Sequence, residues 1–294
     1  MTSVLYDAPG SKARARHRLF GIVSVLVILA IIGFVIWRFI VTGQFSAAKW
    51  QIFTFPRVQQ TLLDATGATL SAFAVAAVGS LVLGLVLAVG RLSDRPWVSR
   101  PFHWFTELFR AIPVLILMML LYYGLPPALG VKWPPYSAVV IALILYNGSV
   151  LAEVFRAGIE ALPKGQREAG FAIGLRKSQV MQSILLPQAV RSMLPVIISQ
   201  LVVTLKDTAL GFIVTYNEIL FQAKFFGSQV QYGTPIVPSA IVAGVLYVGM
   251  CLILSGLAKL AERQLRRSQK VAGPKKGAPP LQATQAAQGA AETI

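Results

Sequence analysis

Acidic residues and cysteine are scarce in this sequence of 294 residues, which carries 11 Asp and Glu and a single cysteine, Cys251. One cysteine forms neither an internal disulfide nor a cysteine-rich metal site, and Cys251 stands inside an apolar run where core packing is its simplest role. The two histidines, His17 and His103, have no companions at metal-ligand spacing, so we expect no metal centre. No arrangement of Ser, His and Asp stands out, and we therefore predict no catalytic residue.

Two further absences narrow the function. The sequence lacks Gly-x-x-x-x-Gly-Lys-[Ser/Thr], the loop that cradles nucleotide phosphates, so we expect this chain to bind no cofactor and not to hydrolyse ATP alone. No repeat of 20 to 50 residues is visible, and no internal duplication supports a two-halved secondary transporter.

Charged residues are also rare, at 13%, whereas hydrophobic residues make up 55% and the mean hydropathy is +0.67. A soluble domain is rarely so apolar. Runs near the length of about 20 residues that crosses a bilayer occur at 19 to 41, 66 to 90, 105 to 125, 136 to 156, 190 to 212 and 236 to 259. We therefore predict an all-α protein with about six transmembrane helices in a lipid bilayer.

The net charge of +16 comes from 27 Lys and Arg residues that cluster at the edges of the apolar runs. This pattern orients a membrane protein and does not indicate nucleic-acid binding. Residues 1–18 form a basic leader, and 19–41 is too long and lacks the small-residue cleavage pattern of a signal peptide, so we interpret it as a retained anchor. With the leader inside, the later basic clusters also fall inside. Both termini are therefore predicted to be cytoplasmic.

The end of the chain has a different composition. Beyond Lys270 it turns to Ala, Gln, Gly and Pro with almost no large apolar residue. Such a segment cannot bury enough apolar surface to offset the entropy of ordering, so we predict that residues 271–294 are disordered.

A polar segment at residues 157–189 separates the fourth and fifth apolar runs. Pro163 and Gly165 are expected to break the fourth helix, Glu168 suits the first turn of a short new helix, and Gly174 suits its end. A second helical piece is expected to stop at Pro187. The pattern has fixed positions at Glu168, Ala169, Gly170, Gly174, Ile184, Leu186 and Pro187. Small residues let another protein approach the backbone closely, so we predict a compact docking element.

This spacing resembles the EAA loop of the membrane subunits of ATP-binding-cassette (ABC) importers, with Gly170 where that pattern usually has Ala. The resemblance extends over residues 60–265. Segments such as Ala152–Ile159 and Lys206–Leu210 resemble the polar amino-acid branch of these permeases, and glutamate permease subunits most of all. Ala111 and Ile112 depart from the branch, which often has Gly and Thr there.

The resemblance implies a type I ABC importer transmembrane domain with one extra N-terminal span, in the cell membrane of a prokaryote. It also implies partners: a second permease subunit, identical or homologous, two cytoplasmic ATPase subunits that use ATP and Mg, and an extracytoplasmic substrate-binding protein. Residues 157–189, hereafter the coupling loop, would carry the force of ATPase closure to the membrane helices and produce alternating access.

Polar residues at membrane depth indicate where substrate crosses, because they are costly in lipid and usually face a cavity or partner. We predict that the substrate-binding residues, hereafter the polar set, are Asn147, Ser149, Gln200, Thr204, Lys206, Asp207 and Thr208. An amino acid needs cationic or donor groups for its carboxylates and an acceptor for its ammonium, and this set offers both. An equally good interpretation is that Lys206 and Asp207 neutralise each other and hold the fifth helix in place.

A rival hypothesis is a stand-alone secondary carrier or channel that uses Lys206 and Asp207 in ion coupling. The coupling loop argues against it, because a carrier has no use for a docking helix. Two further pairs, Glu107 with Arg110 and Glu153 with Arg156, are spaced three apart at predicted inner helix ends. We interpret these as structural or subunit-contact pairs.

Overall fold

The computed structural model describes residues 10–130 and 132–267, and this part of the chain contains helices and turns with no strand. The predicted disordered tail, 271–294, lies outside the described residues. Five helices are long and apolar enough to cross a membrane, and six spans result if one bent pair is counted as a single span. This agrees with the predicted all-α fold of about six transmembrane helices.

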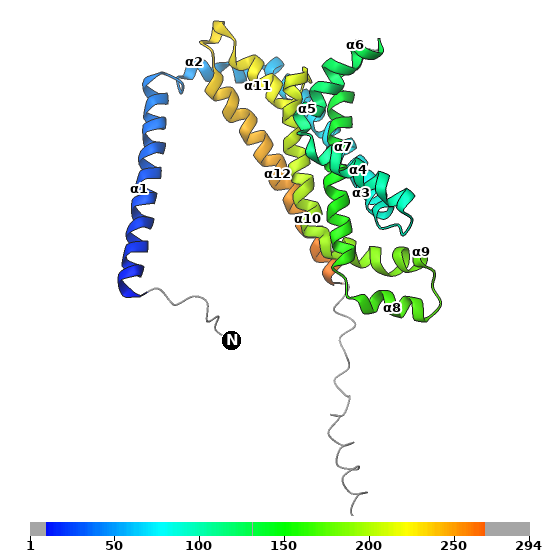
Figure 1. Ribbon diagram of the computed structural model, residues 1–294. Helices are drawn as coiled ribbons and strands as arrows, with labels where there is room; N and C mark the ends of the chain where they lie inside the picture. Colours follow the sequence, from blue (N-terminus) through cyan, green and yellow to red (C-terminus); the bar gives the residue numbers. More distant parts are fainter. Residues whose placement is uncertain (1–9, 131, 268–294) are drawn as a thin grey trace, which may run out of the picture.

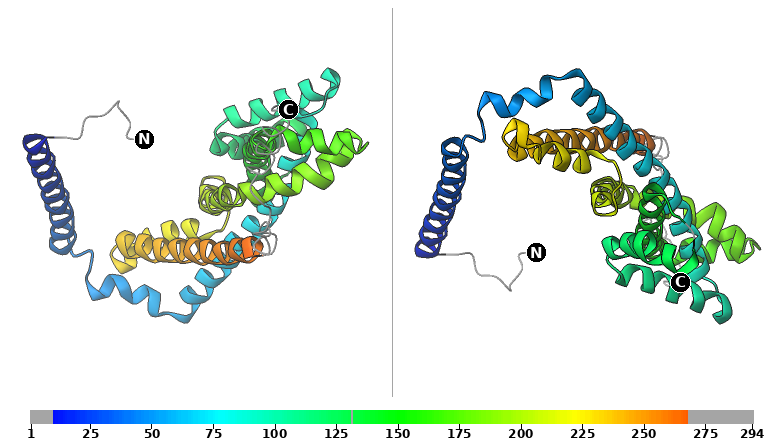
Figure 2. Two further views of the ribbon diagram at one scale, coloured as in Figure 1. Left: turned by 90° about the horizontal axis from the view of Figure 1, so that it is seen from below. Right: turned by 90° about the horizontal axis from the view of Figure 1, so that it is seen from above.

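The N-terminal helix α1 (Ser11–Val41) stands apart from the remaining helices (Figure 1, Figure 2). It begins at Ser11, so the last part of the predicted basic leader belongs to the same helix as the first span. None of the residues in the most apolar 18-residue stretch of α1 is buried. Near its end, Phe39 and the following Phe45 line an apolar groove together with Ile236 and Ile241 of α12 (Ile236–Arg267). Hydropathy alone therefore accounts for α1, and packing within this chain does not.

The centre of the fold is the pair formed by α3 (Pro56–Arg91) and α7 (Pro135–Glu160). The buried side of α3 carries a small residue at every fourth position, namely Ala72, Ala76, Ser80, Gly84 and Ala88. A Cβ at Gly84 would lie 2.8 Å from the Leu151 Cβ and 3.0 Å from the Gly148 carbonyl oxygen. Membrane helices associate through such close packing, because lipid tails offer no hydrophobic driving force between them.

The apolar run at 105 to 125 is not one straight helix, contrary to the sequence prediction. It is divided between α4 (Pro96–Ala111) and α5 (Val114–Met119), and the chain bends by 96° between them. Ile112 is extended, with φ −86° and ψ 123°. The cause is Pro113, whose ring disfavours a helical conformation at the residue before it.

Figure 1 shows that the start of α1, the coupling loop and the end of α12 lie at the same end of the molecule. The remaining elements are α2 (Ala47–Trp50), η1 (Gln51–Thr54), η2 (Leu120–Gly124), α6 (Leu125–Leu129), α8 (Lys164–Ala172), α9 (Lys177–Val180), η3 (Met181–Leu185), α10 (Leu186–Asp207), η4 (Thr208–Val214), α11 (Ile219–Gly227) and η5 (Val230–Tyr232). The two short helices α8 and α9 project from the bundle as a knob.

Candidate functional site

The first helix of the coupling loop begins earlier than the sequence suggested. Pro163 precedes α8, and the Gln166 amide donates to the Pro163 carbonyl oxygen at 3.0 Å. Because the helix starts at Lys164, the exposed Glu168 lies in its second turn and not in its first. The helix macrodipole therefore does not explain this glutamate, and its side chain remains available to a partner.

Gly174 ends α8 as predicted, with a φ of +83°. The Leu175 amide donates to the Gly170 carbonyl at 3.1 Å, and the Gly174 amide donates to the Phe171 carbonyl at 2.9 Å. This pair of hydrogen bonds is a Schellman motif, which needs a left-handed residue after the helix. Glycine takes that conformation without steric cost, and the chain can turn sharply into α9.

The second helical piece does not stop at Pro187, contrary to the prediction. A single helical span runs from Lys177 to Val214 and contains Pro187 within the first turn of α10. A π-helical turn, η3, directly precedes it. A π-helical turn shifts the hydrogen-bonding pattern of the backbone, so the helix can continue through Pro187 although proline has no amide hydrogen to donate. The loop is therefore continuous with the fifth span, which offers a stiff connection into the membrane.

The coupling loop closes on an apolar core of its own. Val180 and Leu185 are buried, and Ile184 and Leu186 pack against them half-buried. Gly170 is buried in the same core, where an added Cβ would lie 2.8 Å from Val180 Cγ2 and 3.0 Å from Ile184 Cδ1. Gly170 therefore serves the packing of its own chain, and the reason predicted for it, close approach of another protein, is wrong.

The exposed members of the predicted set lie on α8 and in the first turn of α10. Glu168, Ala169 and Pro187 are exposed, as is Ile173 with 75% of its surface accessible. Gln188 Nε2 donates to Gln166 Oε1 at 3.3 Å and so fastens α10 to α8. The predicted positions thus divide into an outer surface and an inner core.

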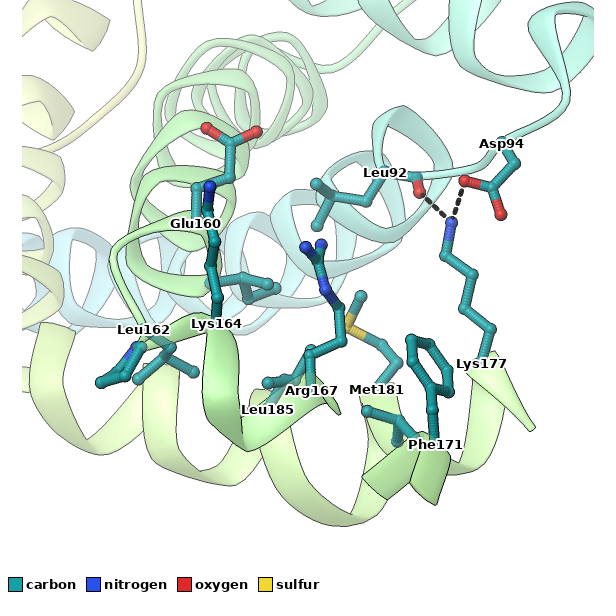
Figure 3. A pocket seen from close by; sticks show the side chains of 13 residues that line it. Leu92, Asp94, Glu160, Leu162, Lys164, Arg167, Phe171, Lys177, Met181 and Leu185 are labelled. Carbon is teal, nitrogen blue, oxygen red and sulfur yellow. Dashed lines mark hydrogen bonds and ion pairs between the residues drawn. The ribbon is translucent and has the colours of Figure 1, made fainter. Parts of the chain in front are cut away.

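A cavity of about 360 Å³ lies between the coupling loop and the turn that joins α3 to α4 (Figure 3). Lys164, Arg167 and Phe171 line one wall from α8, and Leu92 with Asp94 lines the other. Across its rim the Lys177 ammonium donates to the Leu92 carbonyl oxygen at 3.1 Å and forms an ion pair with Asp94. The loop is thus joined to a turn 85 residues away in sequence.

Beside the coupling loop, a network of charges connects the C-terminal ends of α3, α4 and α7. The predicted pairs are present: Arg110 lies 3.2 Å from Glu107, and Arg156 pairs with Glu153. Arg91 joins them. Its guanidinium lies 2.9 Å from Glu153 and 3.5 Å from Glu107, and its side chain is only 8% exposed.

Sequence reasoning missed Arg91 because its partners are 62 and 16 residues away, far outside helical spacing. Arg91 Nη2 also contacts His103 Nδ1 at 3.2 Å. The one available signal was that Arg91 lies among basic residues at the end of an apolar run. A charge that only orients the helix in the membrane would have the same position.

The structure brings part of the polar set together. Gln200 Nε2 donates to Asn147 Oδ1 at 2.7 Å, and Asn147 Nδ2 donates to the Leu143 carbonyl at 3.1 Å. The Thr204 hydroxyl on α10 donates to the Gln200 carbonyl at 2.9 Å, and the hydroxyl of Thr208, the first residue of η4, donates to the Leu205 carbonyl at 2.7 Å. Both threonines are buried and donate to carbonyls three or four residues earlier in the chain. Asn147 and Gln200 thus link two membrane helices, α7 and α10, directly.

The other members of the polar set do not converge on that link. Ser149 is fully buried, and its hydroxyl has no hydrogen-bond partner among the described residues. Lys206 is exposed and Asp207 is half-buried. Within the described part of the chain, no ion pair joins these two charges. Substrate binding by this set therefore stays a prediction.

A second buried network, which the sequence did not predict, surrounds Glu218. This residue is fully buried and caps α11, since its carboxylate accepts hydrogen bonds from the Leu220 and Phe221 amides, both at 2.7 Å. The Tyr247 hydroxyl donates to it at 2.6 Å. Burial raises the pKa of the Glu218 carboxyl, while these hydrogen bonds oppose the rise. A polar residue directly before an apolar helix was the available signal.

The fold and the loop together define the membrane component of a transport complex. Residues 80–267 match the family of binding-protein-dependent transport system inner membrane components, and this chain belongs to that family. The match contains the whole coupling loop and every residue of the polar set.

Several curated relatives are similar over most of their length. The glutamate transport system permease protein GluD of Corynebacterium glutamicum is 38% identical, over 76% of this chain and 82% of GluD. The arginine transport system permease protein ArtQ of Bacillus subtilis is 33% identical, over 72% of this chain and 95% of ArtQ. A probable glutamine ABC transporter permease protein, GlnP, from the same organism is 30% identical, over 65% of this chain and 85% of GlnP.

Solved structures agree on the fold. An amino acid ABC transporter crystallised with histidines superposes with a TM-score of 0.64 and 26% identity, over 72% of this chain and 97% of that one. The MetNI methionine ABC transporter, in an inward-facing conformation, superposes with a TM-score of 0.61 and 19% identity, over 71% of this chain and 98% of that one. The chain therefore has the type I ABC importer transmembrane fold.

Proposed function

We propose that this chain is the permease subunit of an ATP-driven importer of polar amino acids and that its substrate is glutamate. The observation that carries the proposal is the coupling loop, a knob with its own apolar core and an exposed face at one end of a membrane bundle. Glutamate is supported by the likeness to GluD. The similar arginine and glutamine permeases make those two amino acids the competitors to test.

The assembly needs partners with complementary tasks. Two cytoplasmic ATPase subunits dock on the coupling loops of two permease subunits and supply the energy of ATP with Mg. An extracytoplasmic binding protein delivers the substrate. In this arrangement the coupling loop and both termini face the cytoplasm of a prokaryotic cell. The start of α1 and the end of α12 lie at the same end of the molecule as the loop, which supports one common side for all three.

Within the chain, the exposed face of α8 receives the ATPase. Glu168 presents a carboxylate and Ala169 leaves room for close approach. The loop core and the unbroken helix from Lys177 to Val214 transmit the displacement to α10. Because Gln200 on α10 bonds Asn147 on α7, a movement of α10 opens or closes contacts beside the polar set. Lys206 is suitably charged to attract a substrate carboxylate.

The proposal is tested by uptake of labelled glutamate into vesicles that contain the chain, with and without its ATPase and binding-protein subunits. We expect uptake only with ATP and both partners, and competition by unlabelled glutamate above arginine or glutamine. Partner-independent uptake driven by an ion gradient would instead establish the secondary carrier. Transport of arginine or glutamine without glutamate would correct the substrate and keep the class.

The Glu168→Lys variant tests the docking face separately. We expect loss of ATPase association and of uptake, with normal membrane insertion, because the charge on the exposed face of α8 is reversed. An Arg167→Glu variant serves as a matched control for a charge reversal on the adjacent, cavity-lining side of the same helix. Normal association and uptake in Glu168→Lys would contradict the docking role.

A further inference from the structure

We propose that Lys177 and Arg91 clamp the turn between α3 and α4 so that this turn moves as one body with the coupling loop. The inference rests on the proposed function, because it assigns a second route by which ATPase closure reaches the membrane helices. The turn from Leu92 to Asp94, together with Arg91 at the end of α3, is hereafter called the corner. It is not adjacent in sequence to the coupling loop, whose direct continuations are α7 and α10.

The first contact of the clamp is polar and lies at the rim of the cavity in Figure 3. Lys177 is the first residue of α9. Its ammonium forms an ion pair with Asp94 and donates to the Leu92 carbonyl oxygen at 3.1 Å. That carbonyl belongs to the residue that directly follows α3, where helix carbonyls lack partners within the helix. One lysine therefore caps the end of α3 and belongs to the loop at the same time.

The second contact is apolar. Leu92 packs against the core of the coupling loop, which includes Val180 and Leu185. The corner is therefore held by the Leu92 side chain, by the Leu92 carbonyl and by the ion pair of Asp94. These three contacts restrain it in more than one direction. A rigid displacement of the loop therefore displaces the corner.

The third contact fastens the other side of the corner. Arg91 is almost buried and holds Glu153 of α7 at 2.9 Å and Glu107 of α4 at 3.5 Å. Glu153 also pairs with Arg156, which in turn lies 2.6 Å from Glu160 at the last residue of α7. The network holds three arginines and three glutamates when Arg110 is included, so it is neutral. Charges from three helices thus meet at the point where the loop joins the membrane bundle.

Stability alone does not explain Lys177. Its side chain is 45% exposed and that of Asp94 is 80% exposed, and ion pairs in such surroundings contribute little to folding. A residue that contributes little to folding and joins the loop to the corner acts as a positioning residue. Its loss is expected to change coupling while the fold and the docking face remain.

The first experiment measures amino acid imported per ATP hydrolysed in the assembled complex. For Lys177→Gln we expect the ATPase to remain bound and active and this ratio to fall about fivefold or more, the range of ordinary coupling between sites. Lys177→Arg should restore most of the ratio, since the cation is kept. Lys164→Gln is the matched control, because Lys164 is a cation of the same loop with no ion pair within the described residues. An unchanged ratio in Lys177→Gln would overturn the proposal.

The second experiment measures the distance between the corner and the loop directly. A Cys251→Ser background removes the single cysteine, and Ser93→Cys with Ser178→Cys then accepts one spin label on each side. We expect a narrow distance distribution that persists with and without nucleotide, and a broad one in Lys177→Gln. An equally narrow distribution in that variant would refute the clamp.

Arg91→Gln provides a second variant with a larger effect, provided that its thermal stability shows a folded chain. It is expected to broaden the same distance and to lower the import ratio further, since two carboxylates lose their shared partner. The spin-label distances are read without transport. If the unaltered complex imports no amino acid, the proposed function fails, and the distances still decide whether the corner moves with the loop.

Discussion

The coupling loop and the polar set adjoin the same two helices, α7 and α10, but different forces hold them. The loop has an apolar core in which Gly170, Val180 and Leu185 are buried. In the polar set, a hydrogen bond between Gln200 and Asn147 joins two helices, and Thr204 and Thr208 donate to carbonyls four and three residues earlier in the chain. A packed loop keeps its conformation when a partner pushes on it, whereas helices joined by few hydrogen bonds can separate. This difference suits a part that transmits force and a part that admits a ligand.

The strongest test of the packed loop is Gly170→Leu. The side chain has no room beside Val180 and Ile184, and overpacking of this kind costs about 1–3 kcal/mol. We expect the loop to become sensitive to protease in inside-out vesicles and uptake to be lost. Ala169→Leu is the matched control, because Ala169 is exposed, and it should leave the loop protected. Equal protection of both variants would show that the loop core does not depend on Gly170.

A somewhat smaller effect is expected for Gly174→Val. The φ of +83° disfavours a residue with a Cβ by about 1–2 kcal/mol, and a β-branched residue most of all. We expect weaker co-purification of the ATPase and slower uptake, with Gly174→Asn closer to the unaltered chain because asparagine tolerates this conformation. Gly165→Val, in open space at a normal φ, controls for added bulk. If Gly174→Val couples normally, the turn after α8 is not needed for docking.

Asn147→Leu tests whether the hydrogen bond between Asn147 and Gln200 holds the polar set together. Loss of this contact is expected to lower the thermal stability by about 0.6–2 kcal/mol, because the Gln200 amide keeps no partner across the helices. The double variant Asn147→Leu with Gln200→Leu should recover part of that stability, since no orphaned amide remains. Uptake measured on both variants separates the two roles. Recovered stability with lost uptake indicates substrate binding, whereas recovery of both indicates a structural contact.

The smallest expected effect belongs to Lys206→Ala. Lys206 is exposed, so a contact to a substrate carboxylate is partly screened, and the KM for glutamate should rise about fivefold. ATPase association should be unchanged, in contrast to the loop variants. Lys206→Arg keeps the charge, and its KM should lie between that of the unaltered chain and that of Lys206→Ala. An unchanged KM in Lys206→Ala would favour the structural interpretation of this lysine.

Local patterns predicted the elements whose causes are local. The apolar runs located the spans, and Gly174 ended α8 as expected because its left-handed conformation is a property of a single residue. The Glu107 and Glu153 pairs with arginines three residues away were also predictable, because helical spacing brings such residues together. Family resemblance located the coupling loop through its spacing.

The errors arose where the outcome depended on neighbours. Pro187 was expected to end a helix, but a π-helical turn directly before it changes the hydrogen-bonding pattern, and the span continues. Pro113 bends a run that hydropathy presents as one uninterrupted span. Gly170 was taken for a docking residue, although it is buried against Val180. Hydropathy and spacing describe one segment at a time, and each of these outcomes involves the geometry of a second segment.

The sequence by itself determined that this chain crosses a membrane about six times, which helix ends carry positive charge and which loop carries the docking pattern, since all of these follow from composition and short-range spacing. Only the tertiary structure decided that Arg91 is shared between two glutamates, that Lys177 reaches Leu92 and Asp94, and that Asn147 meets Gln200. The physical reason is distance along the chain. Partners separated by tens of residues meet only when packed helices fix their positions.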